Sequence, residues 1–268
     1  MAALLSLCGW VIAGAQGVLL SIASGAFMLA VLHQLPPSLI LNALRARPMS
    51  PWDAGELTAL VEALSTRAGL SVSPSLYQVT ERLPLALTIG NRHDAAIVLS
   101  NGLIGELNVR EVAAVVAHEL VHIRNGDIAM MQLASAVGLA TRMMTRVGLY
   151  LILFSLLANL LSLAQLPLGS LLLITAAPIA VTLLQLALSR SREGEADLEA
   201  AELLGDPQPL AAALIKIRRR EEALLRGMFP YAMPLRVPPL LRDHPVTEER
   251  IRRLLSLDRG GGRGATLT

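Results

Sequence analysis

The sequence predicts a mainly α-helical integral membrane protein that carries an α+β domain with a small β-hairpin on the cytoplasmic side. Two stretches predict the membrane part, because residues 1–44 and 147–189 contain no Asp, Glu, Lys or Arg. Charged residues gather in segments 45–146 and 190–258. Both segments carry helical patterns and the first also has a β-like region at 71–100, so together they predict the domain. With 53% hydrophobic and 16% charged residues, the chain is too apolar for an ordinary soluble domain.

Composition argues against several other classes of protein. The single cysteine, Cys8, excludes a disulfide framework and a cysteine-based zinc site. A net charge of +2 and 3% aromatic residues predict neither a strongly basic surface nor a stacking platform. We therefore expect no nucleic-acid partner, and the composition leaves the oligomeric state open.

Residues 1–44 are predicted to form one membrane span followed by an interfacial segment. The apolar run from Leu4 to Leu32 exceeds the roughly 20 residues that cross a bilayer, and no basic region precedes it as in a signal peptide. Residues 38–44 are too short to cross back, although two early passes remain the alternative. Arg45 and Arg47 are the first charges, and they place the end of the span on the cytoplasmic side.

Residues 45–146 are predicted to form the first half of the domain. A helix from Asp53 to about Ala68 comes first, and a β-like region follows it. Short apolar strands at 85–89 and 95–99 flank a turn. An exposed edge of these strands is suited to hold a peptide by main-chain hydrogen bonds, whereas the alternative is a pair of ordinary core strands.

The next helix carries the sequence His118-Glu-Leu-Val-His122. Asn108, followed three residues later by Glu111, predicts a capping box at its start. Residues four apart share one face of a helix, so the two imidazoles can converge on one ion. Glu119 projects from the neighbouring position, where it can reach a water on that ion without binding the ion itself. This is the H-E-x-x-H arrangement of zinc peptidases, which requires a third protein ligand.

Residues 147–189 predict a transmembrane helical hairpin. As a single helix this stretch would measure roughly 65 Å, about twice the ~30 Å thickness of the hydrocarbon core. We predict one arm at about 147–165 and a returning arm at about 168–188. Arginines on both flanks place both ends in the cytoplasm: Arg142, Arg146, Arg190 and Arg192.

Residues 190–258 are predicted to form the second half of the domain. A helix over 189–201 places Glu193 and Asp197 on one face, although acidic residues on a helix usually mark a solvated surface. A helix at 207–226 carries a basic stripe expected to face solvent or lipid headgroups, and a Pro- and Gly-rich loop follows. The tail, 259–268, is predicted to be disordered.

Three segments carry a resemblance to a known family: HELVHIRNGD at 118–127, SRSREGEAD at 189–197 and DHPVTEERIRRL at 243–254. In order and spacing they resemble the landmarks of the HtpX-like membrane zinc metallopeptidases, which are gluzincins related to the CAAX prenyl proteases. The resemblance covers about residues 50–257. It implies a zincin-like fold for the cytoplasmic domain.

The same resemblance implies roles for particular residues. It implies that Glu193 is the third ligand, so that His118, His122 and Glu193 hold one Zn²⁺ per chain, and that Asp197 is a carboxylate partner of a ligand histidine. His244 is the candidate to stabilise the oxyanion, although it can equally be a residue that precedes and caps the helix over 247–257. Glu119 is the expected general base.

Two departures stand out from the resemblance. Residues 85–88 read Leu-Ala-Leu-Thr where relatives often carry an Asn-Ala-Phe-Ala-like strand, and the N-terminus has one clear span where relatives often have two. These departures concern substrate contact and membrane topology rather than the metal site.

Motif and resemblance together predict a zinc endopeptidase of the bacterial inner (plasma) membrane, with its site facing the cytoplasm. Its expected partners are the lipid bilayer and polypeptide substrates, namely misfolded or membrane proteins, in a role of protein quality control. Three alternatives stay open. They are a processing peptidase of the prenyl-protein type, an intramembrane protease, and a non-enzymatic membrane scaffold that contains zinc.

Overall fold

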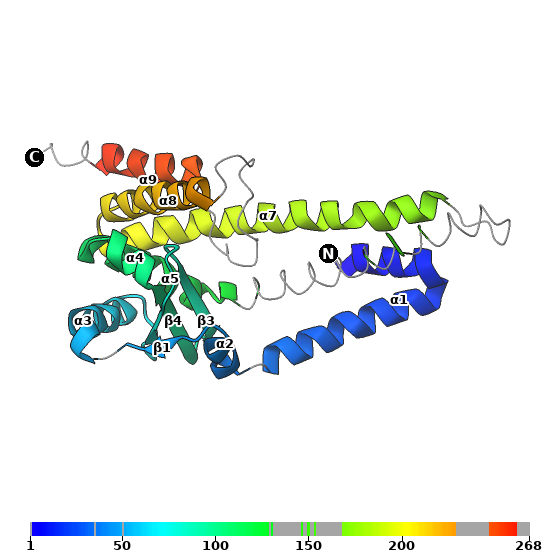
Figure 1. Ribbon diagram of the computed structural model, residues 1–268, viewed down its shortest axis with the longest axis horizontal. Helices are drawn as coiled ribbons and strands as arrows, with labels where there is room; N and C mark the ends of the chain where they lie inside the picture. Colours follow the sequence, from blue (N-terminus) through cyan, green and yellow to red (C-terminus); the bar gives the residue numbers. More distant parts are fainter. Residues whose placement is uncertain are drawn as a thin grey trace, which may run out of the picture. The chain divides into compact units, whose positions relative to one another are not determined.

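The computed structural model describes most of the chain and divides it into two units (Figure 1). The first unit comprises Met1–Leu35 with Met130–Arg190, and the second comprises Pro36–Ala129 with Ser191–Thr268. Within these bounds the structure describes residues 2–34, 36–49, 51–128, 130, 146, 149, 150, 153, 168–228 and 247–261. The five predicted segments, with boundaries at 44, 146, 189 and 258, stay predictions.

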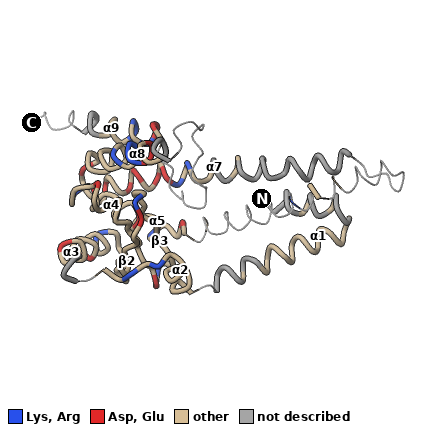
Figure 2. Tube along the Cα trace, in the orientation of Figure 1, with Lys and Arg blue, Asp and Glu red and all other residues tan. Residues whose placement is uncertain are grey.

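The first unit contains α1 (Ala2–Gln34) and the beginning of α7 (Leu168–Leu204). Figure 2 shows α1 without acidic or basic residues where it is described, as the uncharged N-terminal sequence requires. Most of the first predicted hairpin arm, 147–165, lies outside the described residues. The predicted membrane spans stay predictions.

Within the part of the chain that the structure describes, no helix combines the length and the apolar character needed to cross a membrane.

The second unit is built on a four-stranded mixed sheet. Its order is β1-β2-β4-β3, in which β2 and β4 are parallel and the other pairs are antiparallel. The strands are β1 (Arg47–Pro48), β2 (Ser75–Val79), β3 (Ala86–Asn91) and β4 (Asp94–Ser100). The predicted hairpin is confirmed as β3 and β4. Gly90 is required there, because it has φ +102 and a Cβ at this position would lie 1.9 Å from the main-chain oxygen of Asp94.

Strand β4 is buried on both faces, which explains its continuous apolar sequence. Ile97 and Leu99 belong to the main core, whereas Ala96 and Val98 belong to a second cluster with Leu41. Leu41 lies on α2 (Pro37–Ala43), within the segment predicted to be interfacial. Alternation along β4 therefore separates two small cores on opposite faces of the sheet.

Helix α5 (Val109–Asn125) lies in the main core of the second unit. The predicted capping box is confirmed, since Asn108 Oδ1 accepts from the Glu111 amide and Glu111 Oε2 accepts from the Asn108 amide. Every residue from Glu111 to Ile123 is buried. Gly126 ends the helix in the left-handed region with φ 72. The site-bearing helix is thus fixed at both ends and enclosed along its length.

The remaining helices surround α5 and the sheet. They are α3 (Pro51–Arg67), α4 (Asn101–Glu106), α8 (Gln208–Met228) and α9 (Glu248–Gly261). The predicted returning arm and the acidic helix after it form the single helix α7. Helix α9 continues to Gly261, past the predicted start of the tail at residue 259, and residues 262–268 lie outside the described part.

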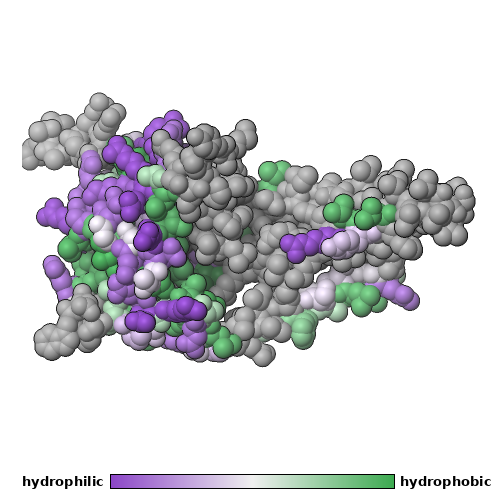
Figure 3. All heavy atoms as spheres, viewed as in Figure 1, coloured by the Kyte–Doolittle hydropathy of each residue, from purple (hydrophilic) through white to green (hydrophobic). Residues whose placement is uncertain are grey.

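Basic residues of α8 make polar contacts with other helices, whereas the sequence predicts that they face solvent or lipid headgroups. Lys216 Nζ donates to Glu111 Oε2 at 2.7 Å, and Arg220 Nε lies 3.8 Å from Glu106 Oε2. Hydrophilic residues cover much of the visible surface of this unit (Figure 3). Lys216 therefore connects α8 to the capped start of α5, rather than simply facing solvent. Most of the loop predicted at 227–241 lies outside the described residues.

Candidate metal centre

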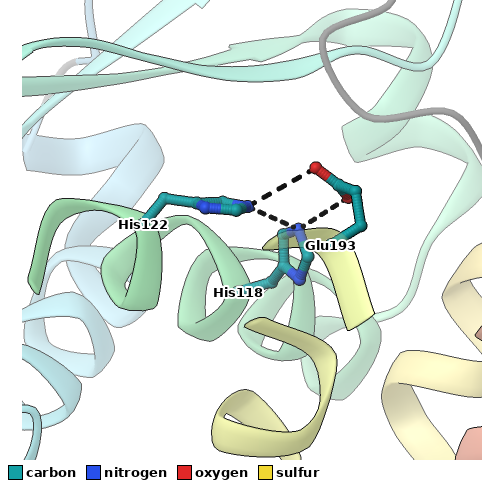
Figure 4. A group of neighbouring side chains, drawn as sticks. All are labelled: His118, His122 and Glu193. Carbon is teal, nitrogen blue, oxygen red and sulfur yellow. Dashed lines mark hydrogen bonds and ion pairs between the residues drawn. The ribbon is translucent and has the colours of Figure 1, made fainter. Parts of the chain in front are cut away.

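Three buried side chains point toward one another from two helices (Figure 4). Helix α5 contributes His118 and His122, and α7 contributes Glu193. The two Nε2 atoms lie 3.1 Å apart. Glu193 Oε2 lies 3.4 Å from Nε2 of His118, and Oε1 lies 3.7 Å from Nε2 of His122. The structure thus brings together the three residues predicted to hold the metal.

The spacing of the donor groups suits a tetrahedral ion. Ligand bonds of about 2.0–2.1 Å at tetrahedral angles place neighbouring donor atoms about 3.3 Å apart. The two Nε2 atoms lie 3.1 Å apart, and each has a different oxygen of Glu193 near it, Oε2 at 3.4 Å from His118 and Oε1 at 3.7 Å from His122. Two imidazoles and one carboxylate are also a donor set that catalytic zinc takes, with one position left for water. The residues present therefore fit a zinc ion.

The outward nitrogen of His122 faces a carboxylate from the turn that follows the same helix. Its Nδ1 lies 3.0 Å from Oδ2 of Asp127. Gly126 bends the chain at the end of α5, so Asp127 returns to a histidine only five residues earlier. A carboxylate accepts only, so Nδ1 of His122 carries the proton and Nε2 offers its lone pair to the site.

The outward nitrogen of His118 faces Asp197, one turn beyond Glu193 on α7. Its Nδ1 lies 3.1 Å from Oδ1 of Asp197. The same carboxylate accepts two hydrogen bonds from Arg250 on α9, both at 2.7 Å. Burial alone would raise the pKa of Asp197, but the hydrogen bonds from Arg250 and His118 outweigh it and lower that pKa. Asp197 therefore stays ionised and keeps a proton on Nδ1 of His118, so that Nε2 is the nitrogen that faces the site.

Arg250 was not singled out by the sequence, although it lies in the segment 243–254 that carries the resemblance. Its Nη1 lies 2.6 Å from Oε2 of Glu193, and its side chain is 7% exposed. One guanidinium thus holds both the proposed ligand Glu193 and Asp197. The available signal was only its place in that segment, because nothing in an arginine at 250 reveals a contact with residues 193 and 197.

The carboxylates of the site change the pKa of His118. Burial lowers its pKa, but hydrogen bonds with Asp197 and Glu193 and the charges of both carboxylates outweigh burial and raise the pKa to about 9. Below that pH the ring of the metal-free protein is a cation among acceptors. A bound metal ion would supply that positive charge, so proton and metal compete for the same place.

Glu119 lies in the core beside the metal centre and is 2% exposed. Its Oε2 accepts a hydrogen bond from Oγ1 of Thr88 at 2.6 Å. Thr88 lies on β3, so this contact joins the edge of the sheet to the helix that carries both histidines. The only signal for this contact in the sequence is the place of Thr88 at the end of the Leu-Ala-Leu-Thr segment.

Further polar contacts join the end of α5 to α7. Arg192 Nε lies 3.6 Å from Oδ1 of Asp127. Glu199 accepts hydrogen bonds from Arg124 and from Asn125, which hold the end of α5 against α7. The candidate oxyanion stabiliser, His244, lies outside the described residues, and its role stays a prediction.

Comparison with known proteins agrees with this geometry. The model of peptidase family M48 matches residues 51–258. The chain is 31% identical to the protease HtpX homolog of Paraburkholderia phytofirmans, over 97% of this chain and 94% of that protein. It is 32% identical to the protease HtpX homolog of Trichormus variabilis, over 96% of this chain and 92% of the relative. For the homolog from Pyrococcus abyssi the values are 34%, 95% and 91%.

The matched range contains both histidines, Glu119, the acidic face of α7 and Arg250, so the match includes the whole described metal centre. The predicted recognition and the predicted hydrolase class are confirmed. This chain belongs to peptidase family M48 and is a metallopeptidase.

Proposed function

We propose that this metallopeptidase is a membrane-bound, zinc-dependent endopeptidase whose site faces the cytoplasm and whose substrates are misfolded or membrane proteins. The observation that carries the proposal is the convergence of His118, His122 and Glu193, with Glu119 next to the first of them. A structural zinc site usually closes its fourth position with a protein ligand. These three ligands leave that position to water, which favours an enzyme over a scaffold.

In the proposed reaction each residue has a defined task. His118, His122 and Glu193 would hold the zinc ion, which when bound polarises the scissile carbonyl and lowers the pKa of a water to roughly 7. Glu119 takes the proton from the attacking water and returns it to the leaving amine. Asp127 and Asp197 keep the Nδ1 protons of the two histidines in place, so that both Nε2 lone pairs stay directed at the ion.

The β3 edge of the sheet favours the proposal that the substrate is a polypeptide. Strand β3 is the last strand in the order β1-β2-β4-β3, so its second edge pairs with no other described strand. It contacts α5, and Thr88 on it reaches the proposed base. A polypeptide that added itself to this edge would pass beside Glu119, and its main chain would supply the hydrogen bonds. Recognition through the main chain suits an enzyme that cuts unfolded segments of varied sequence.

The membrane location rests on the sequence. Residues 1–44 and 147–189 lack charged side chains, and arginines follow or flank each stretch. By the positive-inside rule these arginines lie in the cytoplasm, on the same side as the domain. Reconstitution into liposomes with an epitope at each terminus, followed by protease protection, tests this orientation. In vesicles whose interior corresponds to the cytoplasm, we expect the C-terminal epitope, which follows α9, to be protected. Its digestion there would contradict the proposed topology.

Proteolysis of casein by the detergent-purified full chain tests the reaction. The wild type would be compared with Glu119→Gln and with Glu195→Gln, an exposed glutamate paired with Arg192. We expect wild type and Glu195→Gln to cut, and Glu119→Gln to bind one zinc per chain but to lose activity by at least about 100-fold.

The other outcomes separate the alternatives. Zinc binding without cutting by any of the three proteins contradicts a broad endopeptidase and leaves the processing peptidase or the scaffold. Absence of metal from all three folded proteins contradicts the ligand assignment itself. Equal activity in wild type and Glu119→Gln contradicts the role of Glu119.

A further inference from the structure

Thr88 lies where the edge strand meets the proposed general base. We propose that Thr88 is a positioning residue for Glu119: its hydroxyl holds the carboxylate while its main chain binds the peptide. The inference rests on the proposed function, which it deepens by naming the group that aligns base and substrate. The contact that carries it is the 2.6 Å hydrogen bond from Oγ1 of Thr88 to Oε2 of Glu119, in which the hydroxyl donates.

The side chains of β3 alternate between the two cores, which fixes the direction of the Thr88 hydroxyl. Leu87 and Ile89 pack in the cluster that contains α2, whereas Ala86 packs against the main core that contains α5. Thr88 has the same parity as Ala86, so its side chain projects to the α5 side. A shift of one residue in register would replace the hydroxyl by an apolar side chain.

The main chain of the same residue faces the edge of the sheet. The amide of Ser100 donates to the carbonyl of Leu85 at 2.9 Å, which makes this pair a hydrogen-bonded one. Hydrogen-bonded pairs alternate along an antiparallel ladder, so the main-chain groups of Leu87 point to β4 and those of Thr88 point away from it. Thr88 thus offers a main-chain donor and acceptor to a peptide and a hydroxyl to the base.

This double contact has a catalytic rather than only a structural meaning. A glutamate has several rotatable bonds, and proton transfer requires its oxygen to lie within hydrogen-bond reach of the water. A β-branched threonine in a strand has restricted side-chain freedom, so it is a rigid anchor for that carboxylate. Small misplacements of a reacting group cost up to about 100-fold in rate. Loss of the anchor should therefore slow the chemical step more than it weakens peptide binding.

Steady-state kinetics on fluorescein-labelled casein test the inference with Thr88→Val and Thr88→Ser. Valine keeps the shape but removes the hydroxyl, and serine restores the hydroxyl. We expect Thr88→Val to lower kcat about tenfold or more, with KM within about twofold, and Thr88→Ser to recover most of the loss. Thr66→Val is the matched control, because the exposed Thr66 hydroxyl donates within α3, to the carbonyl of Glu62.

Zinc affinity, measured by competition with a chelator, supplies a readout independent of activity. It should be the same in Thr88→Val and wild type, since Thr88 contacts the base and not a proposed ligand. The inference is overturned if Thr88→Val keeps wild-type kcat, if its loss lies in KM or in metal affinity, or if serine fails to restore activity. If the wild type itself cuts nothing, the proposed function fails first, and the inference falls with it.

Discussion

The two histidines of the metal centre lie on one helix, but one has a carboxylate partner close in the sequence and the other has a partner on a different helix. His122 pairs with Asp127, which follows in the next turn of the chain. His118 pairs with Asp197, which lies on α7 and is held in turn by Arg250 on α9. One side of the site is therefore organised locally, and the other depends on three helices. This difference predicts unequal responses to equivalent substitutions.

The largest effect is expected from Arg250→Met. It removes the guanidinium that buried Asp197 and Glu193 share, and breaking a buried ion pair from one side costs about 3–5 kcal/mol. Urea denaturation of the metal-free protein in detergent, followed by tryptophan fluorescence, measures the loss. Arg252→Met on the exposed face of α9 is the control. Equal stability of the two variants would show that the contacts of Arg250 contribute no more to the free energy of unfolding than those of a surface arginine.

The next largest effect is expected on metal affinity, from Asp197→Asn compared with Asp127→Asn. Loss of a carboxylate behind a ligand histidine typically costs about 10–100-fold in affinity. We expect the upper end for Asp197→Asn, because the new amide also weakens the two bonds from Arg250. The lower end is expected for Asp127→Asn. Chelator competition measures both, and the reverse order would contradict the distinction between the two sides.

The pH dependence sharpens the comparison on the His118 side. The folded-state pKa of His118 is about 9, above the ordinary value of 6.5. Its protonation therefore contributes stability to the metal-free protein that is fully present below pH 6.5 and is lost as the pH rises through about 9. Metal binding has the opposite dependence and should strengthen by up to about tenfold per pH unit, because each bound ion displaces this proton. Urea titrations and zinc titrations between pH 6 and pH 9 check both signs.

The smallest effect is expected from Arg192→Gln on the local side. Arg192 is 34% exposed and lies 3.6 Å from Asp127, a geometry in which ion pairs contribute little. Zinc affinity should change by less than about fivefold, as read by the same chelator competition. A loss of zinc affinity as large as that of Asp127→Asn would contradict this expectation. It would mean that Arg192 holds Asp127 as firmly as Arg250 holds Asp197.

The same comparison explains what the sequence could predict. The capping box at Asn108 and the placement of both histidines on one face depend on spacings of three and four residues, so helix geometry alone predicts them. The β3–β4 hairpin was likewise visible from a local turn. The contacts of Thr88 and Arg250 join residues that lie 31 and 53 positions apart, and no periodicity encodes such pairs. Glu193 could be suggested only through the resemblance, because an acid on a charged helix is ordinarily a surface residue.

The delivery of Arg250 by the last described helix has a consequence for the order of biosynthesis. The ribosome makes His122 first and Arg250 128 residues later (250 − 122 = 128). At a synthesis rate of about 5–20 residues per second, roughly 6–26 s pass between the addition of His122 and that of Arg250, which contacts the third proposed ligand, Glu193. A nascent or prematurely ended chain thus carries both histidines, and after residue 193 all three proposed ligands, without the clamp. The set of contacts around the candidate metal centre is therefore complete only after residue 250 has been translated.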